Sequence, residues 1–248
     1  MRSLIHYVPI ITSVVALIFT IVLYQRWRQK PTATYLAWWM IGVLMYGVGT
    51  LTESVTTLYG WQPWLFRAWY ISGALLGSAP LAQGTVYLTV SKRVANWLTI
   101  SLLLFIAVAA TCVLLTPINL ALVEPYRLSG RVMAWQWVRA FSPFLNLYAL
   151  IFLVGGALWS AWRYWRRDNE LGTRVLGNIS IAAGALLPGI GGSFARFGQI
   201  EVLYATELLG LLLIWLGYQL MVSDAAISIH LIQRMTQRLH TAQSKGVS

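Results

Sequence analysis

Four charged residues in or beside apolar segments are the residues of this sequence most able to do chemistry. They are Glu53, Arg67, Arg196 and Glu207. An ionisable side chain within a membrane span is costly, so by default it faces the interior of the helix bundle or a water-filled cavity and serves a function. Because a buried carboxylate usually has a partner, we expect Glu53 or Glu207 to form an ion pair with Arg67 or Arg196.

Helical spacing adds tyrosines, hydroxyl groups and small residues to the faces that carry these charges. In an α-helix, residues three and four apart lie on one face. The expected ligand-binding residues are Glu53, Arg67, Tyr70, Arg196, Tyr204 and Glu207. Three interpretations stay open: structural ion pairs that hold helices in register, an outward-opening pocket in which the arginines meet anionic groups of a ligand, or a protonatable site.

A proline and a run of glycines precede Arg196. Pro188, Gly189, Gly191 and Gly192 are expected to break the helix and to act as a hinge. Broken backbone in a membrane must be satisfied by a cavity or by other protein, which favours a pocket nearby. Close packing of small residues against a neighbouring helix explains the glycines equally well.

Several kinds of chemistry find no support in the sequence. The three lysines lie outside the apolar segments, so no retinal Schiff base is expected, and the three histidines lie near the ends of the chain. The single cysteine, Cys112, lies in an apolar run, which excludes a disulfide framework. No nucleophile elbow, zinc-protease helix or phosphate-binding loop is present. We therefore expect no enzyme, no catalytic residue, no metal site and no cofactor.

The composition indicates an integral membrane protein. Hydrophobic residues make up 58% and charged residues 10% of the 248-residue chain, whereas soluble domains carry about 25% charged residues. The net charge of +11 comes from short basic clusters between apolar segments, as in membrane proteins, so no nucleic acid is expected as a partner.

Seven apolar segments have the length of about 20 residues that a membrane-spanning helix needs. They cover residues 4–24, 35–59, 65–90, 96–117, 139–162, 174–196 and 201–222. The predicted fold is all-α, a seven-transmembrane helix bundle over residues 1–222 with lipids around it. The outer connection at 118–138 is expected to form either a lid over the bundle or a segment that rests on the headgroups.

Basic residues set the expected orientation. With the N-terminus outside, twelve lysines and arginines fall on the inner side and six on the outer side, which agrees with the positive-inside rule. Residues 223–248 would then form a basic cytoplasmic tail. Its apolar residues from Ile232 to Ala242 recur at spacings of three and four, so the tail could pair with a second copy, contact another membrane protein or lie on the inner leaflet.

Four stretches resemble the seven-helix N-terminal sensor region of bacterial histidine kinases and diguanylate cyclases. They are Trp38-Trp39 through Tyr46-Gly47, Arg67 through Gly73 to Pro80, Arg174 through Pro188, and the end of the last span at Gly217-Tyr218. The resemblance implies a multi-pass protein of the bacterial inner membrane. Because no kinase or cyclase region follows in this sequence, it implies either a stand-alone receptor-like subunit that signals through a separate partner or a membrane module with a non-signalling role.

Together these features predict a receptor-like membrane protein that binds a small or amphipathic ligand in the outer half of the bundle. Two alternatives stay open. A proton- or ion-coupled transporter would use Glu53 and Glu207 along a polar path that continues inward, and a structural subunit of a larger membrane complex would have a solid core.

Overall fold

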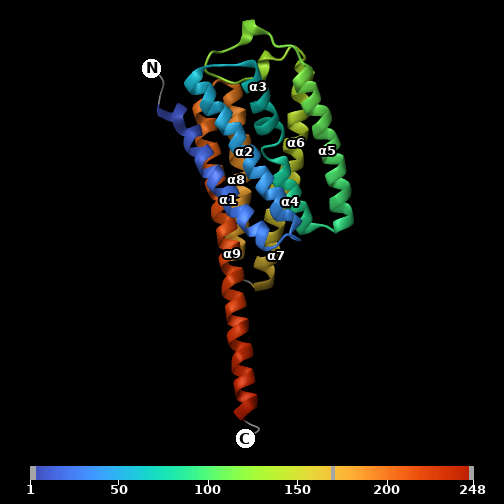
Figure 1. The fold of residues 1–248 in the computed structure, drawn as a ribbon, viewed down its shortest axis with the longest axis vertical. Helices are drawn as coiled ribbons and strands as arrows, with labels where there is room; N and C mark the ends of the chain where they lie inside the picture. The colour runs from blue at the N-terminus through green and yellow to red at the C-terminus, as the bar shows by residue number, and fades with distance from the viewer. Residues whose placement is uncertain (1–3, 169–170, 246–248) are drawn as a thin grey trace.

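The computed structural model describes residues 4–168 and 171–245, and the side chains of all of these except 168, 196 and 224–245. All regular secondary structure in this part of the chain is helical (Figure 1). The all-α prediction is therefore confirmed. Six helical segments are long and apolar enough to cross a membrane: Leu4–Gln29, Thr34–Tyr59, Lys92–Leu115, Gln136–Arg167, Thr173–Ala195 and Ile200–Ser223.

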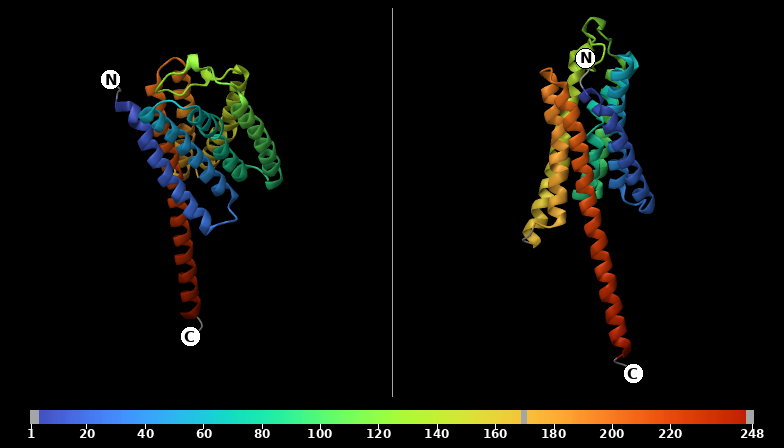
Figure 2. Two further views of the ribbon diagram at one scale, coloured as in Figure 1. Left: turned by 45° about the horizontal axis from the view of Figure 1, so that its top comes forward. Right: turned by 90° about the vertical axis from the view of Figure 1, so that its left-hand side faces the viewer.

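The chain runs back and forth along one axis. α1 (Val8–Gln29) follows the short helix η1 (Leu4–Tyr7), and α2 (Thr34–Tyr59) returns beside it. α5 (Lys92–Leu115) stands at one edge of the bundle, and α8 (Thr173–Arg196) and α9 (Ile200–Lys245) pack closely as a pair. The N-terminus lies at one end of the bundle, and α9 extends far beyond the other end (Figures 1 and 2).

The third predicted span is not one continuous helix. It consists of α3 (Pro63–Trp69), the π-helix η2 (Tyr70–Leu75) and α4 (Ala79–Thr89). The sequence contains the reason, because Gly77 lies against the carbonyl oxygen of Gly73, where a Cβ would come within 2.5 Å, and Pro80 suits the first turn of a new helix. The interrupted segment still runs along the bundle from α3 to α4 (Figure 1).

The segment between α5 and α8 also contains a π-helix. α6 (Phe141–Ala149) leads into η6 (Leu150–Gly155), and α7 (Gly156–Asp168) continues the rod. A π-helix inserts one residue per turn relative to an α-helix and is frequent at functional sites. Both π-helices border the cavity described below.

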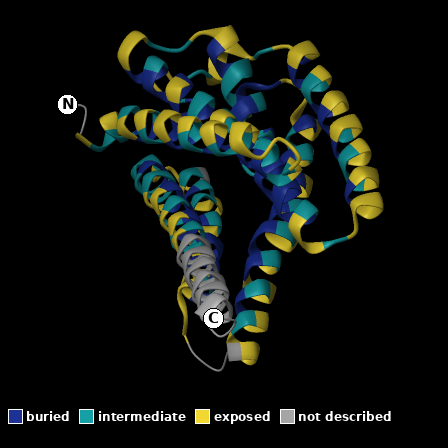
Figure 3. Ribbon diagram, turned by 60° about the horizontal axis from the view of Figure 1, so that its bottom comes forward, coloured by how far each residue is buried: buried dark blue, intermediate teal, exposed yellow. Residues whose placement is uncertain are grey.

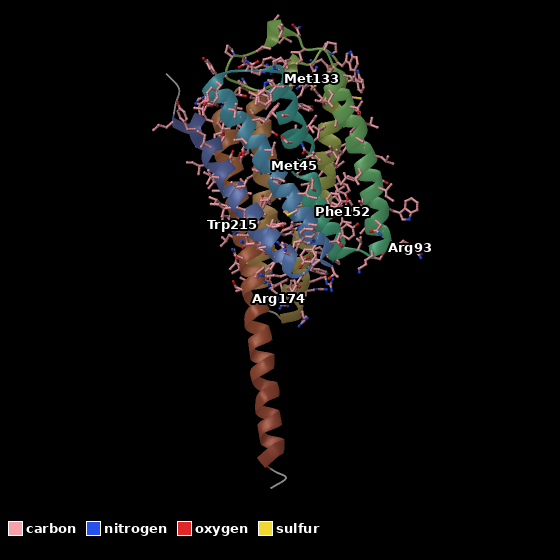
Figure 4. All side chains as sticks on the ribbon, in the orientation of Figure 1. Met45, Arg93, Met133, Phe152, Arg174 and Trp215 are labelled. Atoms are coloured by element: carbon pink, nitrogen blue, oxygen red, sulfur yellow. The ribbon has the colours of Figure 1, made fainter. Side chains whose placement is uncertain are left out.

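A lid closes the end of the bundle that holds the N-terminus. We define the lid as residues 117–140, which include the short helices η3 (Leu120–Leu122), η4 (Gly130–Val132) and η5 (Gln136–Ala140). The lid crosses above the other helices (Figure 2), and its residue Met133, labelled in Figure 4, is fully buried. The interpretation of the 118–138 connection as a lid therefore agrees with the structure.

Two apolar clusters form the core. One lies in the half of the bundle away from the lid and includes Phe19, Trp39, Leu153, Ile214 and Tyr218. The other cluster anchors the lid. In it, Phe66 of α3 and residues of α5 pack against four lid residues, which are Leu128, Val132, Met133 and Val138. Exposed residues cover the outward faces (Figure 3), and many of them are large and apolar, as lipid contact requires.

The boundary expected between residues 222 and 223 is not a structural break, because α9 is one helix from Ile200 to Lys245. The side chains of the predicted seam from Ile232 to Ala242 lie outside the described part of the chain. Basic residues such as Arg93 and Arg174 lie at the end of the bundle opposite the lid (Figure 4).

Candidate functional site

A cavity of about 960 Å³ lies under the lid. Its walls come from α2, the end of α3, η2, α6, η6, α8 and α9, and its roof comes from lid residues 127–131, 136 and 139–140. Ligand sites in proteins commonly enclose about 300–1,000 Å³. The cavity is therefore large enough for a ligand of the size of a lipid headgroup with part of its chains, or for a drug-sized molecule.

Glu53 provides the most buried charge on the cavity wall. It lies six residues before the end of α2 and is 4% exposed. Its Oε1 atom accepts a hydrogen bond of 2.8 Å from the indole Nε1 of Trp69, while its Oε2 atom is buried and has no hydrogen-bond partner among the described residues. The approach of η2 to α2 depends on Gly49, where a Cβ would lie 3.0 Å from Cα of Gly73.

Glu207 faces Glu53 from the first turns of α9. The two side chains lie within hydrogen-bonding reach of each other, and both line the cavity. The Oε2 atom of Glu207 is also buried and lacks a donor in the described structure. The hydroxyl of Tyr46, two turns below Glu53 on α2, donates a hydrogen bond of 2.9 Å to the backbone oxygen of Glu207 and holds the two helices together.

The ion pair expected between these carboxyl groups and Arg67 is not formed. Arg67 does not line the cavity; its Nη2 atom donates a hydrogen bond of 3.2 Å to the carbonyl oxygen of Thr116, just after the end of α5. A helix C-terminus exposes carbonyl groups that attract a guanidinium, and this explains the direction that the side chain takes. The side chain of Arg196, the other expected partner, lies outside the described residues.

The two tyrosines named from the sequence are separated in the structure. Tyr70, in η2, lines the cavity and packs against Gly130 of the lid, where a Cβ would come within 3.1 Å of its ring. Tyr204 is 3% exposed and does not line the cavity. It lies about one turn before Glu207 on α9, near Glu53 and Glu207 and within hydrogen-bonding reach of Thr57, and its ring makes an edge-on contact with that of His6. The structure thus brings Glu53, Tyr70 and Glu207 together on the cavity wall, keeps Tyr204 close to the two carboxyl groups but off that wall, and turns Arg67 away from them.

The predicted break at Pro188 is wrong, because α8 continues through Pro188 to Arg196. A proline frees the carbonyl group four residues before it, here that of Gly184. This oxygen lies against Gly210 of α9, where a Cβ would come within 2.6 Å. The contact with α9 offsets the lost hydrogen bond, so the helix needs no break.

The glycines around Pro188 have two different surroundings. A Cβ on Gly191 would lie 1.9 Å from Oγ1 of Thr206, so this glycine serves helix packing. Gly189 and Gly192 line the cavity, and a Cβ on either would meet no atom within 4 Å. The hinge function proposed for these residues remains a prediction, whereas their role in shaping the cavity wall follows from their positions.

Arginines of the lid form the positive side of the cavity. Arg127 donates a hydrogen bond of 2.7 Å from Nη2 to the carbonyl oxygen of Ala195, at the end of α8, and forms an ion pair of 3.3 Å with Glu124. Arg139 donates a hydrogen bond of 2.9 Å to Oε1 of Gln136. Arg127 therefore ties the lid to α8, and the lid places positive charge above the two carboxyl groups.

The cavity ends in apolar packing at its other end. Leu81, Leu153 and Ile214 form part of its floor and belong to the apolar cluster of the lower half of the bundle. Buried polar side chains also occur between α4, α5 and α6, where Gln83 bonds to Thr99 and Tyr148. The described residues do not include a group of three histidines, cysteines or acidic residues that could hold a metal ion.

Two features of the site escaped the sequence interpretation. One is Trp69, which bonds Glu53 and is not among the ligand-binding residues expected from the sequence. Its position two residues after Arg67 and just before the tyrosine at 70 places it on the other side of that helix from Arg67, which the sequence does show. The lid arginines were counted only as outer charges, and nothing in the sequence places them above the carboxyl groups.

Comparisons of this chain with protein-family models, with curated proteins and with solved structures give no match. The function therefore has to be argued from the cavity itself.

Proposed function

We propose that this protein is a receptor-like, non-enzymatic membrane protein that binds an amphipathic small molecule in the cavity under the lid. The cavity of about 960 Å³ with two buried carboxyl groups is the observation that carries this proposal. Burying polar groups without partners costs free energy. A bound molecule that supplies the missing partners would remove this cost and would fill the space.

The apolar floor of the cavity favours a receptor over a transporter. A carrier needs polar groups that extend to the other side of the bundle, but Leu81, Leu153 and Ile214 meet an apolar cluster there. The space under the lid argues equally against a purely structural subunit, for which a solid core is expected.

α9 offers a route by which binding could be sensed. Glu207 lies in its first turns, and the same helix continues to Lys245, outside the bundle (Figure 1). At 1.5 Å per residue, the 38 residues between them span roughly 57 Å. A ligand that favours one position of α9 over another would move the far end of the helix, where we propose contact with a second copy or with a separate signalling partner.

We further propose seven membrane passes with the N-terminus outside, in the plasma membrane. α3, η2 and α4 together would make the seventh pass. The excess of basic residues at the end opposite the lid supports this orientation, and the proposed role accords with the resemblance to seven-helix sensor regions.

Native mass spectrometry of gently purified protein tests the binding function. Gly192→Phe should fill the cavity without a steric clash at Cβ, because the space beside Gly192 is open. Gly172→Phe is the matched control, since Gly172 also has open space but does not line the cavity. We expect a co-purifying molecule in the wild type and in Gly172→Phe, and its loss in Gly192→Phe. A wild-type protein that carries no molecule, and binds none that is added, would contradict the proposal.

A further inference from the structure

The carboxyl groups of Glu53 and Glu207 face each other without a cation. Each has a buried Oε2 atom that lacks a hydrogen-bond partner among the described residues. The two side chains lie within hydrogen-bonding reach of each other, and two like charges this close repel each other strongly in a low-dielectric interior. The pair therefore holds either a shared proton or a cation. Trp69 supplies one donor, to Oε1 of Glu53, and this bond leaves both Oε2 atoms unsatisfied.

The described arginines nearest to the cavity do not neutralise the pair. Arg67 is bonded to Thr116 and lies behind the wall. Arg127, Arg131 and Arg139 line the roof. Arg127 and Arg139 bond there to Ala195, Glu124 and Gln136, and Arg131 is exposed. No described arginine bonds to the two carboxyl groups, so a cation that replaces a proton shared by the pair would enter from the cavity.

The chemistry of the site favours an ammonium group over a metal ion. A Ca²⁺ or Mg²⁺ ion takes about six oxygen ligands, but the two glutamates have no third acidic side chain near them in the described part of the chain. An ammonium group has N–H donors that can reach one oxygen of each carboxyl group. The rings of Tyr46, Trp69 and Tyr70 line the same region, and aromatic faces attract organic cations.

The opening of the cavity indicates that the rest of the ligand is apolar. Leu147 and Leu150 on the α6–η6 rod and Leu186 on α8 line the cavity, and they are 51%, 46% and 39% exposed. All three lie within segments that are apolar enough to cross a membrane. The cavity is therefore open sideways between α6 and α8, at the level where lipid chains would surround the protein.

We propose that the cavity binds an amphipathic amine, whose protonated amino group lies between Glu53 and Glu207 and whose apolar part extends toward the opening between α6 and α8. This inference rests on the proposed ligand-binding function and names the chemical class of the ligand. A free amphipathic amine and the headgroup of an amine-bearing lipid share this chemistry. The molecule that co-purifies with the wild type distinguishes the two by its mass.

A matched set of three probes tests the proposal. 4-Phenylbutylamine, 4-phenylbutanol and 5-phenylpentanoate share a phenyl ring on four methylene groups and carry a positive, a neutral and a negative end. Each is added to detergent-purified protein, and the midpoint temperature of unfolding is measured against probe concentration. We expect the amine to raise this temperature, and the alcohol and the carboxylate to have no effect at the same concentrations.

Variants assign the effect to the two carboxyl groups. Glu53→Gln and Glu207→Gln should each weaken amine binding at least tenfold, whereas Glu53→Asp should keep the preference for the amine because it keeps the charge. Glu201→Gln is the matched control on α9, since Glu201 does not line the cavity. The unfolding temperature of each variant without probe shows that it is folded.

Three results would overturn the proposal: no effect of the amine on the wild type, an equal effect of the alcohol or the carboxylate, or undiminished amine binding in both glutamine variants. Tighter binding of the carboxylate than of the amine would support the ligand-binding function but overturn the amine proposal. It would indicate that the lid arginines, and not the two glutamates, contact the charged end of the ligand. Failure of all three probes, with no co-purifying molecule, would remove the binding function as well.

Discussion

Nε1 of Trp69 donates a hydrogen bond of 2.8 Å to Oε1 of Glu53, and this bond joins the end of α3 to α2 at the cavity wall. It is the one donor from outside the acidic pair that the described residues offer to the Glu53 carboxyl group. The bond fixes the direction of the carboxyl group, and it leaves the buried Oε2 atom without a donor of its own.

Removing this donor should destabilise the protein. Trp69→Phe keeps an aromatic ring but leaves Oε1 of Glu53 without its partner, a loss of about 1–3 kcal/mol for a buried group. Thermal unfolding in detergent checks this, with Trp64→Phe as the control because Trp64 is 63% exposed. Equal unfolding temperatures for the two variants would show that the Trp69–Glu53 bond contributes little.

Close packing of α8 on α9 should make Gly184 intolerant of a side chain. A Cβ on Gly184 would lie 2.5 Å from the carbonyl oxygen of Gly210 and 2.9 Å from the backbone nitrogen of Ile214. We expect Gly184→Ala to lower the unfolding temperature by separating the helices.

Gly189→Ala is the control for this prediction. It lies on the same helix with open space around it, and it should leave stability unchanged or raise it by up to about 1 kcal/mol through helix propensity. The prediction fails if alanine is tolerated equally at both positions.

Arg127 should hold the lid closed. Arg127→Ala removes the bond to the carbonyl oxygen of Ala195, so we expect faster hydrogen exchange in the lid than in the wild type. Glu124→Gln keeps that bond and removes only the ion pair, in which the Glu124 side chain is 50% exposed. Because exposed ion pairs contribute only about 0–1 kcal/mol, this control should exchange like the wild type. If hydrogen exchange in the lid of Arg127→Ala is the same as in the wild type, the apolar residues of the lid hold it closed and the bond from Arg127 does not.

Seven membrane passes should place the N-terminus and the lid on the same side of the membrane. In a Cys112→Ser background, cysteines at positions 4 and 122 should both react with an impermeant maleimide in intact cells. A cysteine at position 93, at the other end of the bundle, should react only after permeabilisation. If the segment from α3 to α4 did not cross, positions 4 and 122 would label from opposite sides.

Apolar length could predict the helices but not their interruptions. The spans follow from runs of about 20 apolar residues, and six of them have helical counterparts in the structure. Apolar length alone predicts a continuous third span, although that span contains Gly73, Gly77 and Pro80. Pro188 predicts a break, although α8 continues through it. A proline restricts only local backbone, and whether the helix breaks depends on a neighbour such as Gly210.

Side-chain partners were predicted less well than positions. Helical spacing correctly placed Glu53, Tyr70 and Glu207 in one region, because depth and face follow from residue number. It could not show that Arg67 turns to the carbonyl group of Thr116, because that choice depends on where α5 ends in space. Trp69 was missed for the same reason. A tryptophan near the end of an apolar segment indicates a membrane surface, and only the fold brings this one to Glu53.

A cryo-electron microscopy map of the wild-type protein in lipid nanodiscs, saturated with 4-phenylbutylamine, tests the central claim most directly. The account predicts density for the ligand beneath the lid, with its amino group in contact with the Oε2 atoms of Glu53 and Glu207. A cavity filled by side chains, or carboxyl groups bonded to Arg67 or Arg196 with no ligand between them, would contradict the account and favour a structural role for the charges.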